Sequence, residues 1–464
     1  MDRPNVLLIV SDDHGYGDFT RFGHDERIRT PNLDRLAASG VSCTDAYVTA
    51  PICSPSRAGL ISGTYQQRWG ARWFDTSRFP DHLPSLAERF EELGYATGYF
   101  GKVHYGPEEP GDRACPPHHG FAETFYGLAG MQEGRLNYMR RSRRDMAEYG
   151  EEGSWRMAVH PLRDGDTEVE PEGFLTAELG RRTAEFVETH ADEPFFAMVA
   201  FNAVHNFTFQ LPQEELERRG LPAYADWKDG DGKYTDWYDR AIWPNLPNGR
   251  EYYLAQLELM DAEVGRLLDA LEARGLSENT VVVYLTDNGG STCNFGDNDP
   301  LRGGKYTLWE GGIRVPFLVR WPAGGIGGGA EHGAVVSALD LYPSLLSAAG
   351  AAPETWSHGD GIDQVGAWRA SAAGRHDPAG RTLHWDTGFQ WAIRDGDWKL
   401  QHVDDHPTVA HLSSYEHAPI APGRRLTNLA EDPGEQRDLS PDHPEIVRRL
   451  AERHAAWQAE VAQH

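Results

Sequence analysis

Cysteine is scarce in this chain, with four residues in 464: Cys43, Cys53, Cys115 and Cys293. None of them belongs to a CxxC pair, so the closely spaced thiols of a zinc knuckle are missing. Four cysteines are also too few for a disulfide scaffold in a chain of this length. The fold must therefore depend on a hydrophobic core, and a cysteine with a function has to be found from its surroundings.

Positive charge is in short supply as well. The chain has 44 Lys and Arg residues against 71 Asp and Glu residues, which gives a formal net charge of −27. We expect neither a nucleic acid nor an anionic membrane surface as a partner, since both are bound by an excess of positive charge. A small anionic substrate is not excluded, because salt screens distant charges beyond about 8 Å and a few local cations can then dominate.

Long hydrophobic runs are also absent. The first apolar run, Asn5–Ser11, is followed at once by Asp12 and Asp13, and no run in the chain is long enough to cross a bilayer. No signal peptide precedes this run. We therefore predict a cytoplasmic protein for the sequence as it stands, and a periplasmic or secreted one if a leader has been removed.

The chain does contain a regular alternation of strand-like and helix-like segments. Short apolar runs predict buried strands, and apolar residues at helical spacing predict helices. The strands are expected at 5–11, 95–100, 195–201, 281–285 and 316–321, and the helices at 83–93, 175–189 and 250–274. This alternation predicts an α/β fold in which helices cover both faces of a large, mostly parallel sheet.

The pattern changes after about residue 370. Residues 382–403 are typical of a β-hairpin with an Asp395-Gly396 turn, and residues 444–462 of an amphipathic helix. We predict a large domain over 1–370 and a small α+β subdomain with an antiparallel sheet over 371–464. Two aperiodic stretches, 128–170 and 206–248, are predicted to be long surface excursions near the functional site.

Polar residues follow several of the predicted strands. In open α/β sheets this carboxyl edge is where ligands bind. Two of these motifs supply only hard oxygen ligands, which favours calcium or magnesium over zinc. They are Asp12 with Asp13 and Asp287 with Asn288. Either pair alone is more often a helix cap or a solvated turn, but their shared position at strand ends favours a metal site.

Cys53 stands at the start of a predicted short helix, with Ser54 as its cap, Pro55 as its first residue and Gly63 as its end. A helix N-terminus favours negative charge, so a thiol there can be an activated nucleophile. A half-buried cysteine without a role is the more common alternative.

Several cationic or titratable side chains accompany Cys53 in the predicted loops. Each of them alone is more often a surface charge or a hydrogen-bonded histidine. Together with Cys53 they predict an oxyanion pocket beside a divalent metal. They are Arg57, Lys102, His104, His205 and Lys305.

These motifs resemble those of type I, formylglycine-dependent sulfatases of the alkaline phosphatase superfamily, and in particular bacterial carbohydrate sulfatases. The resemblance covers nearly the whole chain and is weakest in 128–170 and 206–248. Its most specific part is CxPSR with a downstream LxxG, although Ser62 stands where threonine is more usual. The segments that carry it include 53-CSPSR-57, 60-LISG-63, 12-DDHGYGD-18, 101-GKVH-104, 287-DNG-289 and 303-GGKYTLWEGGIRVPFLVRWP-322.

The resemblance implies that a formylglycine-generating enzyme oxidises Cys53 to formylglycine. One hydroxyl of the hydrated aldehyde would then accept the sulfo group, and the other would let the carbon expel sulfate. A divalent ion, Ca²⁺ in most relatives, would be held by the residue at position 53 and by four side chains. These are Asp12, Asp13, Asp287 and Asn288.

The resemblance also implies roles for the remaining candidates. Arg57 would anchor the aldehyde hydrate, Lys102 and Lys305 would bind sulfate oxygens, and His104 would hydrogen-bond the hydrate. His205 would protonate the leaving alcohol. This last position departs from the family pattern, because Asn206 follows where relatives often have proline.

Other functions leave different marks on a sequence. A phosphonate monoester or phosphodiester hydrolase of the same superfamily is the main alternative, but it favours histidine where Asn288 stands. A zinc alkaline phosphatase would need a Ser or Thr nucleophile and histidine-rich ligands, and an inactive binding protein would have broken motifs.

Aromatic-rich loops favour a sulfated monosaccharide or oligosaccharide as the substrate, because aromatic rings pack against sugar faces. Six residues near the motifs are candidates to face the sugar. They are Arg72, Trp73, His118, His119, Asn298 and Arg302.

Overall fold

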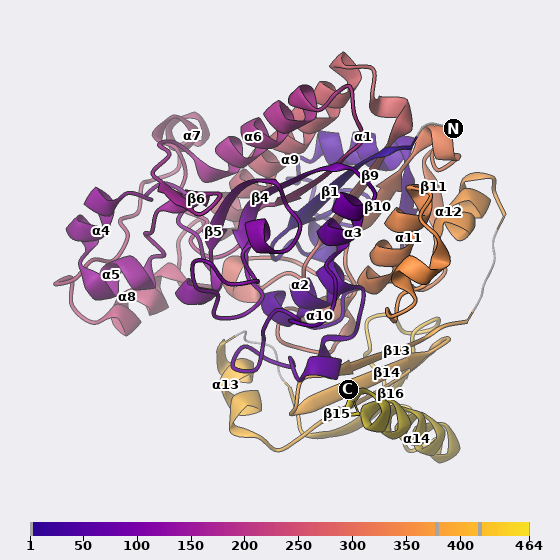
Figure 1. The fold of residues 1–464 in the computed structure, drawn as a ribbon. Coiled ribbons are helices and arrows are strands. Elements are labelled where there is room, and N and C mark those ends of the chain that lie inside the picture. Colours follow the sequence, from indigo (N-terminus) through magenta and orange to yellow (C-terminus); the bar gives the residue numbers. More distant parts are fainter. Residues whose placement is uncertain (1–2, 376–379, 416–419, 464) are drawn as a thin grey trace.

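The protein was analysed as a computed structural model that describes residues 3–375, 380–415 and 420–463 (Figure 1). Its main feature is a ten-stranded sheet with the order β11-β2-β10-β9-β1-β8-β4-β5-β6-β7. In that order the strands are Ala330–His332, Val41–Cys43, Phe317–Arg320, Thr280–Thr286, Asn5–Ser11, Phe195–Ala200, Ala96–Val103, Glu123–Leu128, Leu162–Asp164 and Thr167–Val169.

The five central strands, from β9 to β5, run parallel to one another. Antiparallel strands flank them, since β10 opposes β9 on one side and β6 opposes β5 on the other. The predicted large, mostly parallel sheet is therefore confirmed, while the reversed direction of β10 and the short outer strands were not predicted. In the centre, Val10 of β1 pairs with Ala200 and with Leu285, so three strands end level with one another.

Helices cover both faces of this sheet. Alternate residues of β1 point to opposite faces, and Leu7 and Leu8 therefore belong to two separate hydrophobic cores. The Leu7 face carries α1 (Pro31–Ser39), α6 (Leu175–Thr189) and α9 (Gly249–Ala273). The Leu8 face carries α2 (Cys53–Ser62), α3 (Leu86–Glu92), α11 (Leu341–Ala348) and α12 (Val365–Ala372). Each fully buried aliphatic side chain contributes about 1.5–3 kcal/mol to these cores.

A separate four-stranded antiparallel sheet lies below the large one in Figure 1. It consists of β13 (Thr382–Asp386), β14 (Gln390–Asp395), β15 (Trp398–Val403) and β16 (Gly423–Asn428). The helix α14 (Pro444–Val461) packs on it through Leu450, and α13 (Pro407–Tyr415) follows β15.

The small sheet agrees with the predicted antiparallel sheet, and residues 382–403 form three strands where one hairpin was expected. The Asp395-Gly396 turn joins the second and third of them, with Gly396 at φ +62°. The predicted domain boundary at residue 370 falls inside α12, and the division into two domains remains a prediction.

The two aperiodic stretches form short elements around a third hydrophobic cluster. This cluster joins Tyr149, Phe209 and Tyr252, which come from three distant parts of the chain. The elements of this region are α4 (Arg143–Tyr149), α5 (Glu151–Arg156), α7 (Gln213–Arg219) and α8 (Tyr234–Ala241). The remaining elements are α10 (Glu310–Ile313) and a pair of parallel strands, β3 (Ala46–Tyr47) and β12 (Val336–Ser337).

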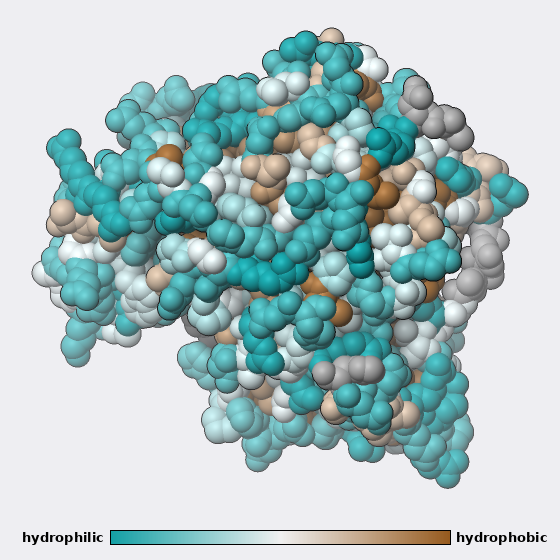
Figure 2. Space-filling model, viewed as in Figure 1, coloured by the Kyte–Doolittle hydropathy of each residue, from teal (hydrophilic) through white to brown (hydrophobic). Residues whose placement is uncertain are grey.

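The face of the molecule seen in Figure 2 is mostly hydrophilic, with scattered apolar residues, as the abundance of acidic residues suggests. Over the described ranges, no helix is long and apolar enough to cross a membrane.

The two sheets are joined by a buried set of charged side chains, here called the interface cluster. Lys399 of β15 lies with Nζ 2.9 Å from Glu310 Oε1 and 3.0 Å from Glu435 Oε1. Arg394 of β14 reaches across to Asp45, with Nη1 2.7 Å from Oδ1. The large unit contributes Asp45 and Glu310, and residues after 390 contribute the other three.

Candidate functional site

The candidate residues lie on loops at one edge of the large sheet. Ser11 of β1 pairs with Thr286 of β9, so the residues that follow these two strands start from the same level. Lys102 lies near the end of β4, and His205 lies in the loop that follows β8. Because these four strands are parallel neighbours, their carboxyl ends bring the polar loops together.

Asp13 is held at the centre of the site by three donors. Its backbone adopts φ +57°, a left-handed conformation that Asp tolerates better than most residues. Its carboxylate accepts hydrogen bonds from Asn288 Nδ2 at 2.7 Å and Asn294 Nδ2 at 2.8 Å. Lys305 Nζ lies 2.8 Å from Oδ1 and 2.9 Å from Oδ2. No motif pointed to Asn294, which reaches the site from a turn after β9.

Asp12 and Asp287 share one arginine. Arg57 donates from Nε to Asp287 Oδ2 at 2.7 Å and from Nη2 to Asp12 Oδ2 at 3.4 Å. Lys102 Nζ also donates to Asp12 Oδ2, and all four side chains are at most 2% exposed. The site therefore sets three buried carboxylates against three buried cations.

Two oxygens of this set remain without a hydrogen bond. Within the described residues, Asp12 Oδ1 and Asn288 Oδ1 are buried and have no partner. Burial and the neighbouring Asp287 raise the pKa of Asp12 to about 7, more than Lys102 and Arg57 lower it. Buried polar atoms in proteins normally have partners, so an oxygen-preferring divalent cation fits this donor set.

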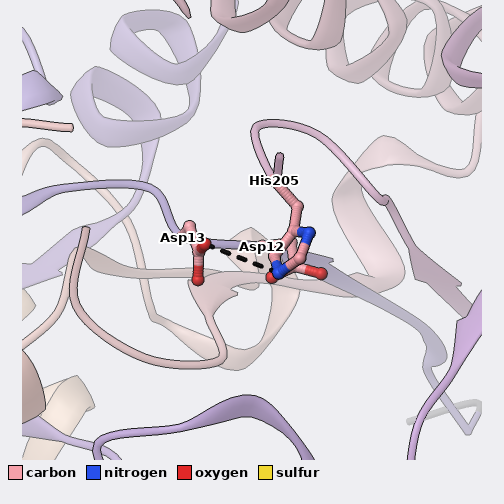
Figure 3. A group of neighbouring side chains, drawn as sticks. All are labelled: Asp12, Asp13 and His205. Carbon is pink, nitrogen blue, oxygen red and sulfur yellow. Dashed lines mark ion pairs between the residues drawn. The ribbon is translucent and has the colours of Figure 1, made fainter. Parts of the chain in front are cut away.

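His205 lies beside the same carboxylates. Ligand atoms of Asp12, Asp13 and His205 all lie within 4.8 Å of one another. Figure 3 shows these three side chains together. His205 Nε2 is 3.8 Å from Asp13 Oδ2, which is longer than a hydrogen bond. Burial and the charges of Lys305 and Lys102 hold the pKa of His205 well below its usual value.

His104 lies in the same electrostatic environment. Burial and the charges of Lys102, Arg57 and Lys305 lower its pKa strongly. Its Nδ1, like that of His205, has no hydrogen-bond partner in the described part of the chain. Both rings are thus buried with one nitrogen left for a further partner.

Cys53 is the first residue of α2, and its side chain is buried at 1% exposure. The N-cap residue is Ile52, without a side-chain hydrogen bond, so the expected cap at Ser54 was wrong. Gly63 ends the helix as expected, with φ +65°. Burial raises the pKa of the Cys53 thiol even though Lys102 and Lys305 act in the opposite direction, so the structure argues against an activated thiolate.

The Lys305 loop is fixed by backbone hydrogen bonds. Lys305 N donates to Gly290 O at 3.1 Å, and Tyr306 N donates to Pro51 O at 2.7 Å. Asn298 was expected to face the sugar, but it is buried and donates to the carbonyls of Gly290 and Gly303 at 2.9 and 3.1 Å. Asn298 therefore holds the loop together.

Glu108 fixes the loop that follows Lys102, and sequence patterns did not single it out. Its Oε1 accepts from the backbone N–H groups of Tyr105 and Gly106, and its Oε2 accepts from that of Gly130 at 3.1 Å. Burial raises its pKa to about 7. Glu108 thus joins the loop after β4, where His104 lies, to the loop after β5.

The other sugar-facing candidates take different positions. Arg72 lies 3.8 Å from Asp386, and His118 contacts Asp166 at 3.0 Å. His119 is fully buried, and Arg302 packs its guanidinium 3.9 Å from the centre of the Trp309 ring. Trp73 differs from these four, because it lines a cavity beside Tyr306.

Known proteins resemble this chain over most of its length. A family model described as Sulfatase matches residues 4–351. Arylsulfatase J of Mus musculus is 30% identical over an alignment that covers 97% of this chain and 75% of the relative's length. An N-acetylgalactosamine-6-O-sulfatase of Bacteroides thetaiotaomicron is 25% identical over 97% of this chain and 92% of the relative's length.

Solved structures give the same picture. Ps i-CgsB superposes with a TM-score of 0.79 and 29% identity, covering 98% of this chain and 93% of that one, and it has also been solved in complex with k-i-k-neocarrahexaose. The phosphonate monoester hydrolase of Agrobacterium radiobacter is more distant, with a TM-score of 0.64 and 21% identity over 99% and 96% of the two chains, and shares the fold. With a matching family model over three quarters of its length and the alkaline phosphatase-like fold, the chain belongs to the sulfatase family of sulfuric ester hydrolases.

Proposed function

We propose that the protein removes sulfate from a sulfated carbohydrate at the site around Cys53. The observation that carries this proposal is the buried cluster of Asp12, Asp13 and Asp287 with three cations, which lies in the electrostatic environment of Cys53. Burying so many charges is costly unless they are paired, and such sites are usually retained for function.

The charge balance of the site supports a bound dication. Three carboxylates already balance three cations, so a sulfate ester would add an uncompensated negative charge. A dication next to Asp12 Oδ1 and Asn288 Oδ1 would compensate that charge and would release Lys102 and Lys305 from their carboxylates. The residues that would hold it are those expected from the sequence: Asp12, Asp13, Asp287, Asn288 and the residue at position 53.

Two groups would supply chemistry that the unmodified side chains lack. Ca²⁺ would polarise the sulfate and favour ionisation of a bound hydroxyl. Formylglycine, made from Cys53 by a formylglycine-generating enzyme, would supply a hydrated aldehyde as the nucleophile. The raised pKa of the Cys53 thiol supports this, since an unmodified thiol here would be a poor nucleophile.

The surrounding residues bind and orient. Arg57 reaches Asp287 and Asp12 from the second turn of α2 and would fix residue 53 relative to the carboxylates. Lys102 approaches from β4 and Lys305 from the loop before α10, and the two would bind two sulfate oxygens, stabilising the charge that develops in the transition state. His205 Nε2 would protonate the leaving alcohol once a bound sulfate ester offsets the charges of Lys305 and Lys102, which lower the pKa of His205 in this structure. His104 would hydrogen-bond the residue at position 53.

Carbohydrate is the substrate class that the relatives favour. One is named for N-acetylgalactosamine 6-O-sulfate, and Ps i-CgsB has been solved with a neocarrahexaose. The aromatic residues Trp73, Phe74 and Tyr306 lie beside His104 and Lys305, where the alcohol part of the ester would be. Such rings bind the apolar faces of sugars.

Mass spectrometry of the peptide that contains Cys53 tests the modification directly. The converted protein should then release sulfate from sulfated saccharides in the presence of Ca²⁺. If it hydrolyses phosphonate monoesters or phosphodiesters and leaves every sulfate ester intact, the alternative function is correct. If the peptide carries an unmodified thiol and the protein is still fully active, the proposed nucleophile is wrong.

A further inference from the structure

A cavity of about 330 Å³ adjoins the catalytic side chains. Tyr306, one residue after Lys305, lines it, and the Phe74 ring lies 6.3 Å from the ring of His104. Arg135 also lines it and is close enough for its charge to lower the pKa of His205. The cavity therefore begins where the leaving alcohol of a sulfate ester would be.

Five parts of the chain that are distant in sequence build this cavity. They are the Trp73–Phe74 segment, the loop after β5 with Glu133 and Arg135, helix α8, the loop with Tyr306, and helix α13 between β15 and β16. Figure 1 places α8 and α13 on the same side of the molecule, and the outline in Figure 2 is indented between them. The two stretches without sequence periodicity, 128–170 and 206–248, thus contribute to one binding surface.

One wall of the cavity is aromatic. The rings of Trp73 and Phe74 each lie 6.0 Å from the ring of Tyr306 and 5.6 Å from each other. Trp73 is fixed from behind by Phe389 at 4.7 Å, while Phe74 is 37% exposed. Such a surface binds the C–H face of a sugar ring and offers no charge.

Another part of the cavity lining carries an ion pair between Glu133 and Arg135. Arg135 Nη2 lies 2.9 Å from Glu133 Oε2, and Arg156 Nη1 lies 3.6 Å from Glu133 Oε1. Arg135 also donates to Arg156 O at 3.2 Å and packs its guanidinium 5.3 Å from the centre of the Phe207 ring. Among the described residues that line the cavity, Glu133 is the one acidic side chain and Arg135 the one Lys or Arg.

The turn that carries this ion pair is packed directly on a catalytic side chain. Gly134 lies between Glu133 and Arg135 with φ +80°, and a Cβ there would come within 2.6 Å of His104 Cε1. The position of Glu133 relative to His104 is therefore fixed by close packing.

We propose that this cavity binds a single sugar ring whose only charged group is the sulfate to be removed, such as a hexose or N-acetylhexosamine monosulfate. This inference rests on the proposed function. The volume is near the lower end of the roughly 300–1,000 Å³ range of ligand sites, which suits one ring. Arg135 is already paired with Glu133, so this pair offers little net positive charge to a second sulfate or a carboxylate, while the Glu133 carboxylate can accept sugar hydroxyls.

The test compares substrates that differ by one charge. We measure kcat/KM for N-acetylgalactosamine 6-sulfate, for the 4-sulfate and for the 4,6-disulfate, and take the ratio of each monosulfate to the disulfate. The converted protein without substitutions should prefer a monosulfate by about 10-fold or more, as burial of one uncompensated charge implies. A preference for the disulfate would overturn the inference.

Glu133→Gln keeps the size and removes the charge. It should lower the mono-to-disulfate ratio about 10-fold, chiefly through a lower KM for the disulfate, because Arg135 loses its acidic partner and its charge can then attract the second anion. Glu152→Gln is the matched control, since Glu152 also pairs with Arg156, at 3.5 Å, but lies outside the cavity. An unchanged ratio in Glu133→Gln, or an equal change in the control, would contradict the role of Glu133.

Phe74→Ala tests the aromatic wall independently of charge, and its exposed position makes misfolding a small concern. It should raise KM for the monosulfate about 10-fold, as loss of one stacking ring implies, with a smaller change in kcat. An unchanged KM would contradict the placement of the sugar. Hydrolysis of 4-nitrophenyl sulfate distinguishes a failure of the proposed function from a failure of this inference. If the converted protein cleaves no sulfate ester at all, the proposed function is wrong. If it cleaves sulfate esters without the predicted preference for a monosulfate, this inference alone is wrong.

Discussion

Two buried clusters of charge lie on either side of the short helix α10, and they differ in how completely their atoms are bonded. In the interface cluster, Glu310 accepts from Tyr47 Oη at 2.5 Å and from Lys399 Nζ at 2.9 Å. Within the described residues, no buried side-chain nitrogen or oxygen of that cluster lacks a hydrogen-bond partner. In the catalytic cluster, Asp12 Oδ1, Asn288 Oδ1 and the Nδ1 atoms of two histidines do lack one.

The pKa shifts follow the same division, with one exception. Burial would raise the pKa of Glu310, but Lys399, Arg314 and Arg394 lower it below its usual value. Burial and Asp287 raise the pKa of Asp12 to about 7 despite two nearby cations. Glu435 is the exception, since burial and Glu310, with which it shares Lys399, raise its pKa to about 7. Unsatisfied atoms, more than buried charge as such, therefore distinguish a site that binds from a cluster that holds two units together.

The sharpest contrast between the clusters should come from Cys53→Ala. We expect a loss of sulfatase activity of about 10⁴-fold or more, because the nucleophile is removed from a site whose parts act together. Unfolding in urea should change little in comparison. Cys115→Ser serves as the control, since Cys115 is also buried but belongs to neither cluster, and its Sγ donates to the Glu109 carbonyl at 3.2 Å. Activity retained in Cys53→Ala would show that residue 53 is not the nucleophile of the catalytic cluster.

Lys399→Met should have the largest effect on stability. It leaves Glu310 and Glu435 buried without their shared cation, which should cost about 3–5 kcal/mol in the free energy of unfolding. Urea unfolding measures this, and added Ca²⁺ should stabilise the variant and the unsubstituted protein equally, so that the difference between them remains. Lys228→Met removes an exposed pair with Glu148 and should cost under about 1 kcal/mol. Equal losses in both variants would show that the interface cluster contributes little.

Lys305→Met makes the corresponding change in the catalytic cluster. We expect kcat to fall about 10²- to 10³-fold, as for loss of one group that stabilises transition-state charge. The variant should also be less stable in the absence of metal, because Asp13 loses its cation. Here Ca²⁺ should stabilise the variant by about 2.7 kcal/mol at 100 times its dissociation constant. At a given Ca²⁺ concentration the gain should exceed that of the unsubstituted protein, because the metal also compensates the charge left on Asp13. If Ca²⁺ narrows the deficit of Lys399→Met equally well, the metal does not act specifically on the catalytic cluster.

Glu108 should give the smallest of these effects on stability. It is intermediate between the two clusters, since it is buried and bonded, but to backbone donors and not to cations. Its pKa is raised to about 7 in the folded protein, so between about pH 4.5 and 7 the folded state holds a proton that the unfolded state has lost. Its contribution to stability therefore falls as pH rises through this window, by about 1–3 kcal/mol. Glu108→Gln should remove that part of the pH dependence in urea unfolding measured at pH 5 and pH 7.5. An identical pH slope in both proteins would contradict the assignment.

Much of the fold could be predicted because long apolar patterns leave little choice. The helix expected at 250–274 is found at Gly249–Ala273, and the strand at 5–11 has the same bounds in the structure. The short strands β2, β6, β7 and β11 were not found, since three residues are too few to show a period. Their formation depends on neighbours that are distant in the chain.

The site was predictable where residues stand in motifs and not where folding alone brings them in. Asp12 and Asp287 could be identified because they follow strong strand signals. No such signal points to Asn294, Glu108 or Glu133. Asn294 contributes a single hydrogen bond, Glu108 binds backbone donors, and Glu133 forms an ion pair. All three interactions depend on the geometry of loops. Ser54 was misassigned as a cap because it is a capping residue type, but the helix begins two residues earlier than expected.

The burial of Cys53 has a consequence for the order of events during biosynthesis. A modifying enzyme that reads residues 53–57 needs them as an accessible peptide, but in the folded protein Cys53 and Arg57 are 1% and 3% exposed and wound into α2. The proposed conversion of Cys53 would therefore have to precede the closing of the large sheet over this segment.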